Sequence, residues 1–141
     1  MAKRNVEAFQ KAHKQFNKRD FDGLITAMAD NFTYVDRARG LTFKGRVAFK
    51  DFMQGWVTAF PDAKVAQPKY TDAGDRVIAE FTGKGTNNGP LGPMPATGKV
   101  MNLPFCEVMT FNKKGKIASG VVYYDQMTLL GQLGHVPAPT A

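Results

Sequence analysis

The chain has 141 residues, of which 43% are hydrophobic and 22% charged. This length favours a single domain whose core needs no disulfide or metal, and no apolar run approaches the ~20 residues that span a membrane. The basic N-terminus lacks the apolar stretch of a secretory signal, and the lone Cys106 excludes an internal disulfide. We therefore expect a cytoplasmic protein with no membrane partner.

The net charge is +7, and eleven of the nineteen basic residues lie among the first fifty positions, against five acidic ones. Such a bias is compatible with a nucleic-acid surface or with a solvated basic face. We favour the solvated face, because no nucleic-acid motif and no basic stripe interleaved with exposed aromatic residues is present. No nucleic-acid partner is expected.

The first sixty residues predict three helices. Residues 2–18 place apolar side chains on one face, and His13 lies on or beside this stripe. We interpret His13 as a partly buried helix residue rather than a catalytic one. Asp20 is a suitable N-cap for a second, short helix, and residues 46–60 form a third helix that ends before Pro61.

The third helix is unusually rich in aromatic residues. Its broad apolar face comprises Phe49, Phe52, Met53, Trp56, Val57 and Phe60. These side chains either only fill the core, or fill the core and also form one wall of a ligand cavity. The periodicity of the sequence does not distinguish these two possibilities.

The remaining chain predicts mostly strands, with period-two alternation. They cover residues 32–37, 41–44, 63–71, 76–84, 99–111 and 116–124, followed by a helix over 126–133. Phe32, Tyr34 and Asp36 share one face of the first strand, and Pro68 indicates a bulge or an edge position in the third. The order predicts an α+β fold in one domain over residues 1–134, with a mobile tail over 135–141.

Residues 85–98 form a connection rich in glycine and proline. A loop of this length in a compact domain is usually functional or mobile. We interpret it as a flap over a pocket mouth; the alternative is a long connection without a role.

Glu107 occupies an unusual position in the strand over 99–111. It shares the odd positions with large apolar residues, among them Phe105 and Met109. A carboxylate that points into an apolar layer should have a raised pKa, which suits acid/base chemistry. The alternatives are a buried ion pair or a bulge near Pro104 that turns Glu107 outward.

Asp125 stands between the last strand and the last helix. By alternation, Tyr123 and Asp125 share a face with Glu107 across adjacent strands. An aspartate directly before a helix is also a common N-cap, and on pattern alone we favour that role.

The order of these elements, with several short stretches, resembles the SnoaL-like polyketide cyclases of the nuclear transport factor 2-like superfamily. The stretches are Gly45 to Phe49, Phe60-Pro61-Asp62, Gly89 to Lys99, Gly115-Lys116-Ile117, and Asp125 with Leu130 and Gln132 to Gly134. The resemblance implies a cone-shaped α+β barrel, in which three N-terminal helices pack on a curved antiparallel sheet and a short helix closes the chain.

The resemblance also implies a function. Characterised cyclases of this family close a ring by aldol condensation without a metal or cofactor, and the aspartate before the terminal helix, here Asp125, acts as acid/base. This shifts our interpretation of Asp125 to catalysis combined with capping. Superfamily members often form dimers, and we expect a homodimer formed through the outer face of the sheet.

Two positions depart from the family pattern. Glu107 stands where a histidine is common, and Asn87 replaces the histidine of Gly-Thr-His. We therefore expect no histidine in the cavity. Instead, Glu107 and Asp125 form a coupled pair of carboxylates, and Asn87, Tyr34 and Tyr123 supply hydrogen bonds to a substrate oxygen.

The predicted function is cofactor-free acid/base chemistry, aldol cyclisation or isomerisation, on a small hydrophobic carbonyl compound. Asp125 and Glu107 are the predicted catalytic residues, and no metal ligand is expected. The predicted substrate-binding residues are Tyr34, Asp36, Trp56, Phe60, Asn87, Phe105, Met109 and Tyr123. The alternative is a protein of the same fold that binds a small hydrophobic molecule without reaction.

Overall fold

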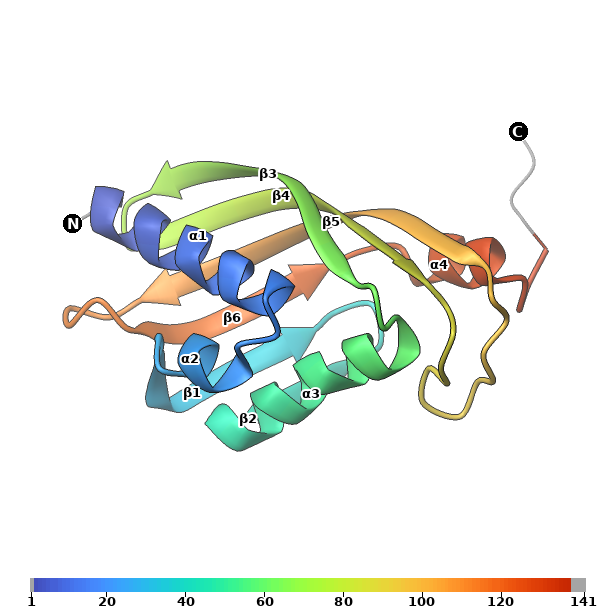
Figure 1. Cartoon of the computed structure of the whole chain (residues 1–141). Helices are drawn as coiled ribbons and strands as arrows, with labels where there is room; N and C mark the ends of the chain where they lie inside the picture. The colour runs from blue at the N-terminus through green and yellow to red at the C-terminus, as the bar shows by residue number, and fades with distance from the viewer. Residues whose placement is uncertain (1, 138–141) are drawn as a thin grey trace.

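A computed structural model describes residues 2–137, which form four α-helices and a six-stranded sheet (Figure 1). The helices are α1 (Ala2–Asn17), α2 (Phe21–Ile25), α3 (Arg46–Ala59) and α4 (Gln126–Leu133). The strands are β1 (Met28–Asp36), β2 (Leu41–Lys44), β3 (Lys64–Ala73), β4 (Arg76–Thr86), β5 (Val100–Phe111) and β6 (Ile117–Tyr123). The expected α+β architecture is confirmed, and most bounds lie within a few residues of the prediction.

The sheet has the strand order β2-β1-β6-β5-β4-β3. All neighbours are antiparallel except β1 and β6, which run parallel. The sheet is therefore mixed, and the prediction of a wholly antiparallel sheet was wrong at this one pair. Alternation along a strand tells which face is buried, but it does not tell which strand lies beside it.

Helices α1, α2 and α3 lie against the inner face of the curved sheet (Figure 1). Helix α1 crosses β3 and β4, α3 packs on β1 and β2, and α4 contacts β5. The core between these layers is rich in aromatic and methionine side chains, including Phe9, Met28, Phe32, Phe60, Leu103 and Met109. No helix in residues 2–137 is long and apolar enough to cross a membrane.

The ends of the elements follow local chemistry. The Asp20 side chain caps α2 by accepting a hydrogen bond from the Gly23 N–H, as predicted. Around Pro68, the pairing of β3 with β4 shifts register between Ala66 and Lys69, which confirms the predicted irregularity. Gly134 ends α4 with a positive φ of 84°.

One irregularity in β6 decides which of its residues face the core. Thr110 pairs with Ser119 but Phe111 pairs with Ile117, so Ala118 is an extra residue in the strand. This bulge reverses the alternation: Val122 is buried and Tyr123 is 47% exposed. The prediction that Tyr123 shares a face with Glu107 was wrong for this reason.

Only part of the predicted C-terminal tail can be placed. The N–H of His135 donates a hydrogen bond to the Leu130 carbonyl, so the first residue of the tail is bonded to the end of α4. Residues 138–141 lie outside the described part of the chain, and the predicted mobility of the tail stays a prediction.

Candidate functional site

Glu107 points into the interior, as the alternation of β5 predicts. Every odd residue from 101 to 111 is buried, and Glu107 is 7% exposed between Phe105 and Met109. Its strand neighbours are Ala79 of β4 and Val122 of β6, in regular register. The alternative of a bulge that turns Glu107 outward is therefore wrong.

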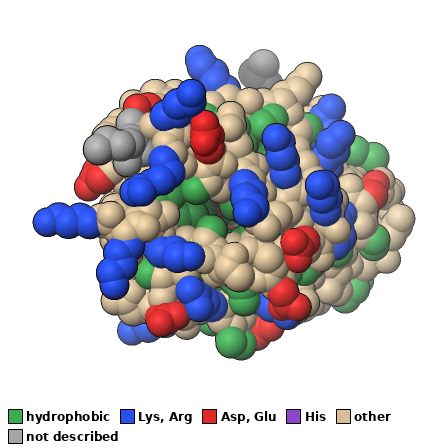
Figure 2. All heavy atoms as spheres, turned by 60° about the vertical axis from the view of Figure 1, so that its left-hand side comes forward, with side chains coloured by type: hydrophobic (Ala, Val, Ile, Leu, Met, Phe, Trp, Pro, Cys, Tyr) green, Lys and Arg blue, Asp and Glu red, His purple; other side chains and the backbone are tan. Residues whose placement is uncertain are grey.

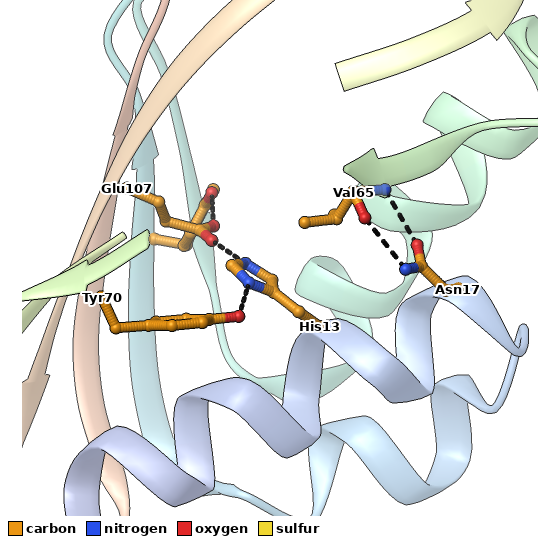
Figure 3. Close-up of polar contacts among 6 residues, drawn as sticks. His13, Asn17, Val65, Tyr70 and Glu107 are labelled. Atoms are coloured by element: carbon orange, nitrogen blue, oxygen red, sulfur yellow. Dashed lines mark hydrogen bonds and ion pairs between the residues drawn. The ribbon is translucent and has the colours of Figure 1, made fainter. Parts of the chain in front are cut away.

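Both oxygens of the Glu107 carboxylate are bonded. His13 of α1 places Nε2 2.9 Å from Oε1, and the hydroxyl of Tyr34 in β1 donates to Oε2. Figure 3 shows His13 reaching across from its helix to the strand. The buried partnership foreseen for Glu107 exists, but its partner is a histidine rather than a lysine or arginine.

The expectation that the cavity holds no histidine was wrong. His13 is buried and lines the cavity. It is separated from Glu107 by 94 positions in the sequence, so spacing could not connect them. The available signal was that His13 lies on the apolar stripe of its helix, next to Phe9 and Ala12.

Tyr70 of β3 extends the network toward the surface. Its hydroxyl lies 2.7 Å from Nδ1 of His13 (Figure 3), and its side chain is half-buried. When His13 is neutral with its proton on Nε2, it donates to Glu107 and accepts from Tyr70. Four elements thus contribute one continuous chain of polar groups: Tyr34, Glu107, His13 and Tyr70.

The environment keeps both tyrosines protonated. Burial, followed by the charge of Glu107 and the hydrogen bond to it, raises the pKa of Tyr34 well above its ordinary value. Burial and the Glu107 charge raise the pKa of Tyr70 to about 12. At neutral pH both hydroxyls are therefore donors, and neither is a base.

The end of α1 is fastened to the sheet beside this network. The Asn17 side chain donates to the Val65 carbonyl at 3.0 Å and accepts from the Val65 N–H at 2.8 Å (Figure 3). The Arg19 guanidinium donates to the carbonyls of Pro61 and Ala63. These bonds fix the helix that carries His13.

The carboxylate faces a cavity of about 100 Å³ between the helices and the sheet. Its walls are aromatic and aliphatic, and its polar side chains are Glu107, His13, Tyr34 and, at the exposed rim, Lys64. Figure 2 shows a hollow with hydrophobic side chains at its floor and lysine and arginine side chains around it. The combination gives a largely apolar chamber whose acid/base groups are Glu107 and His13.

Several predicted substrate-binding residues line this cavity, namely Tyr34, Trp56, Phe105 and Met109. The third helix therefore contributes core and cavity wall together. Phe60 is fully buried but does not line the cavity; its ring stacks on Trp56 at 6.2 Å between centroids.

Asp36 is fully buried outside the cavity. Its carboxylate accepts from Arg39 Nε at 3.0 Å and from the Tyr124 hydroxyl at 2.7 Å. The Arg39 guanidinium in turn covers the rings of Phe52 and Trp56, at 5.5 and 5.3 Å from their centroids. Asp36 thus supports the aromatic wall and does not itself line the cavity.

Asn87 also serves the backbone rather than the cavity. Its amide nitrogen donates to the carbonyls of Ala59 and Gly89, and its oxygen accepts from the N–H and hydroxyl of Thr97. Asn87 is fully buried and lies outside the cavity lining. The expected position of Asn87 in the cavity was therefore wrong.

The loop after β4 does not cover this cavity. None of the residues 87–99 lines it, and Asn87 and Gly89 bind the loop to the end of α3. A Cβ on Gly89 would lie 1.9 Å from the Thr58 carbonyl oxygen, so the close approach requires glycine. The interpretation as a flap over the pocket was wrong for the cavity that holds Glu107.

Asp125 is exposed and caps α4. Its carboxylate accepts from the Met127 N–H at 3.1 Å and the Thr128 hydroxyl at 2.7 Å, and the Thr128 bond is the main cause that lowers its pKa. It borders an open groove on the outer face of the sheet, with Tyr123 and Cys106. The predicted convergence of Asp125 and Glu107 in one cavity was therefore wrong.

Residues 2–137 contain no group of three or more histidine, cysteine or acidic side chains arranged to hold a metal ion. The chemistry available in the cavity is that of the network around Glu107: a carboxylate, an imidazole and a phenol in apolar surroundings.

Comparisons with known proteins place this arrangement in a family. No curated protein was found to match the sequence. A candidate polyketide cyclase from Xanthomonas campestris is 23% identical, with a TM-score of 0.82 over 94% of this chain and 98% of that chain.

Two further structures share the fold and were crystallised with small molecules. A hypothetical protein with a ketosteroid isomerase-like fold from Catenulispora acidiphila, in complex with trimethylamine, is 23% identical with a TM-score of 0.78 over 94% of each chain. TerC, crystallised with polyporic acid, is 22% identical with a TM-score of 0.75 over 92% of this chain and 98% of that chain. Residues 7–133 match the family of SnoaL-like polyketide cyclases, and the chain therefore belongs to this family.

Proposed function

We propose that the protein is a cofactor-free acid/base enzyme that acts on a small hydrophobic carbonyl compound, with Glu107 as the proton acceptor. The observation that carries the proposal is a buried carboxylate, held by His13 and Tyr34, at the wall of an apolar cavity. Ionisable side chains that converge in an apolar cavity favour a catalytic role, and the raised pKa of Tyr34 in the same lining adds to this.

The proposed step begins with Glu107 as a carboxylate. It takes a proton from the carbon next to the substrate carbonyl, and the electron pair of that C–H bond moves into an enolate. In an aldol ring closure the enolate attacks a second carbonyl, and the alkoxide that forms takes the proton back from Glu107. In an isomerisation the enolate takes this proton back at another carbon. Tyr34 stays protonated and donates its single O–H to Glu107 in the resting site; once Glu107 carries the proton, this O–H is the candidate donor to the substrate oxygen.

The size of the cavity limits the substrate. Its 100 Å³ is below the roughly 300–1,000 Å³ typical of ligand pockets. A small compound fits directly, whereas a larger one requires movement of the unbranched methionines in the wall, Met28, Met53, Met101 and Met109. We therefore propose a small substrate, no larger than a single ring, which enters as these methionines move.

The proposal is tested by measuring the exchange of α-protons for deuterium in small cyclic ketones and β-keto esters by NMR, which requires no knowledge of the product. Glu107→Gln keeps the size of the side chain and removes the base, so exchange should fall about 10²- to 10⁴-fold. Glu80→Gln, the same change on an exposed residue of β4, is the matched control. Equal exchange by Glu107→Gln and the parent protein, both folded by circular dichroism, would refute the proposal.

A second candidate function is binding without reaction. It is favoured by the hydrogen bonds that both Glu107 oxygens already accept from the protein and by the two structures that hold small molecules, trimethylamine and polyporic acid. Native mass spectrometry of gently purified protein would reveal a carried ligand. A retained ligand together with no exchange on any carbonyl compound would support this function over catalysis.

A further inference from the structure

The charges around the cavity do not balance when His13 is neutral. Glu107 is the only acidic residue among the described residues that line it, and the only basic ones are His13 and Lys64. Lys64 is exposed at the rim, where water screens its charge. A carboxylate that is 7% exposed is then without a cationic partner, which is unfavourable in apolar surroundings.

The walls offer a second feature that favours positive charge. Aromatic rings surround the cavity, namely those of Tyr34, Phe49, Phe52, Trp56, Phe81 and Phe105. They are packed on one another, with Trp56 edge-on to Phe105 at 5.9 Å and Phe81 stacked on Phe105 at 5.3 Å. Such ring faces carry partial negative charge and attract organic cations.

From these two features we infer that the cavity is a binding site for small alkylated ammonium ions. The inference rests on the same carboxylate as the proposed function, but it requires no turnover. A methylated ammonium ion presents apolar surface to the rings and a diffuse charge to Glu107. A metal ion would need several oxygen ligands in place of its water, and an anion would be repelled by Glu107.

The volume limits the ion that the cavity can hold. An apolar cavity of about 150 Å³ is known to accept benzene, and the cavity here measures about 100 Å³. A methylated ammonium ion is about as bulky as benzene, so it enters only when the unbranched methionine side chains of the wall move. Larger amines require a larger movement.

The experiment compares tetramethylammonium chloride with tert-butanol, a neutral molecule of similar size. Binding is measured by calorimetry and by the fluorescence of Trp56, the only tryptophan of the chain, with sodium chloride as the salt control. At about pH 8 the cation should bind about tenfold or more tightly than the alcohol.

Two variants test which side chains hold the cation. Glu107→Gln should weaken cation binding about tenfold or more and leave the alcohol unchanged, whereas Glu80→Gln should change neither. If Glu107→Gln does not fold, Trp56→Leu provides the test by calorimetry, since it removes a ring face and should weaken only the cation. Equal affinity of the two probes, no saturable binding of the cation, or cation binding that survives both Glu107→Gln and Trp56→Leu would overturn the inference.

The proposed catalytic function and the inference of cation binding can be refuted independently. Cation binding that persists in a protein without proton exchange would leave the inference standing and remove the catalytic function. Proton exchange in a protein that binds the cation and the alcohol equally would support the catalytic function and remove the inference of cation binding.

Discussion

Asp125 and Glu107 are both acidic, but their surroundings assign them different roles. The Asp125 carboxylate is exposed and accepts from Thr128 and Met127 in the first turn of α4. We predict that Asp125→Asn leaves α-proton exchange unchanged, because asparagine is also a good N-cap, and that Asp125→Ala lowers the melting temperature. Loss of exchange in a folded Asp125→Asn protein would restore the catalytic role that the family resemblance implies.

The sign of the pH dependence follows from the lowered pKa of Asp125. Because the folded protein binds this proton more weakly than the unfolded chain, the stabilisation is present at neutral pH. It is lost as the pH falls through the lowered pKa. The difference in melting temperature between the parent protein and Asp125→Ala should therefore shrink in acid, which thermal unfolding at a series of pH values measures.

The residues of the site differ in how far the sequence could reveal them. Glu107 was predictable, because β5 alternates without interruption and a residue's parity then fixes its face. His13 was not, since its role depends on the position of α1 across the sheet rather than on any local pattern. Asp125 was misplaced because one extra residue, Ala118, reverses the alternation upstream of it.

At the scale of elements, Asn87 joins the loop after β4 to the end of α3. Its four hydrogen bonds link Ala59, Gly89 and Thr97. Asn87→Ala leaves these buried groups without partners, and we predict a loss of about 2–3 kcal/mol in the free energy of unfolding. Chemical denaturation measures the loss.

Because Asn87 lies outside the cavity lining, the affinity of a cavity ligand should stay within about twofold of the parent value below the unfolding transition. Asn88→Ala, on the exposed neighbour, is the matched control and should cost little. A weakened ligand affinity in the folded Asn87→Ala protein would indicate that the loop shapes the cavity after all.

The elements themselves were largely predictable, because helix and strand periods are local properties of the chain. The bounds of β2 and α4 were predicted without error, and α1 and α3 to within one residue. What the patterns could not show is the pairing of β1 with β6, which are separated by most of the chain. That pairing brings Tyr34 to Glu107, so the site depends on the least predictable feature of the sheet.

At the scale of the whole molecule, the helices cover only one face of the sheet. Helices α1, α2 and α3 lie on the inner face (Figure 1), and an open groove crosses β3 to β6 on the other. Tyr123, 47% exposed, borders this groove together with Pro104 and Cys106. Because no described helix covers this groove, we expect it to be the face through which two copies associate.

We propose that the protein is a homodimer formed through this outer face. A symmetric pairing would bury Tyr123 of both copies, so Tyr123→Asp would place two charges in the interface and should convert the dimer to a monomer in sedimentation analysis. Val47→Asp, on an exposed apolar residue of α3, is the matched control and should leave the dimer intact. Since Tyr123 points away from the cavity, the monomeric variant should retain proton exchange. A parent protein that sediments as a monomer would contradict the proposal.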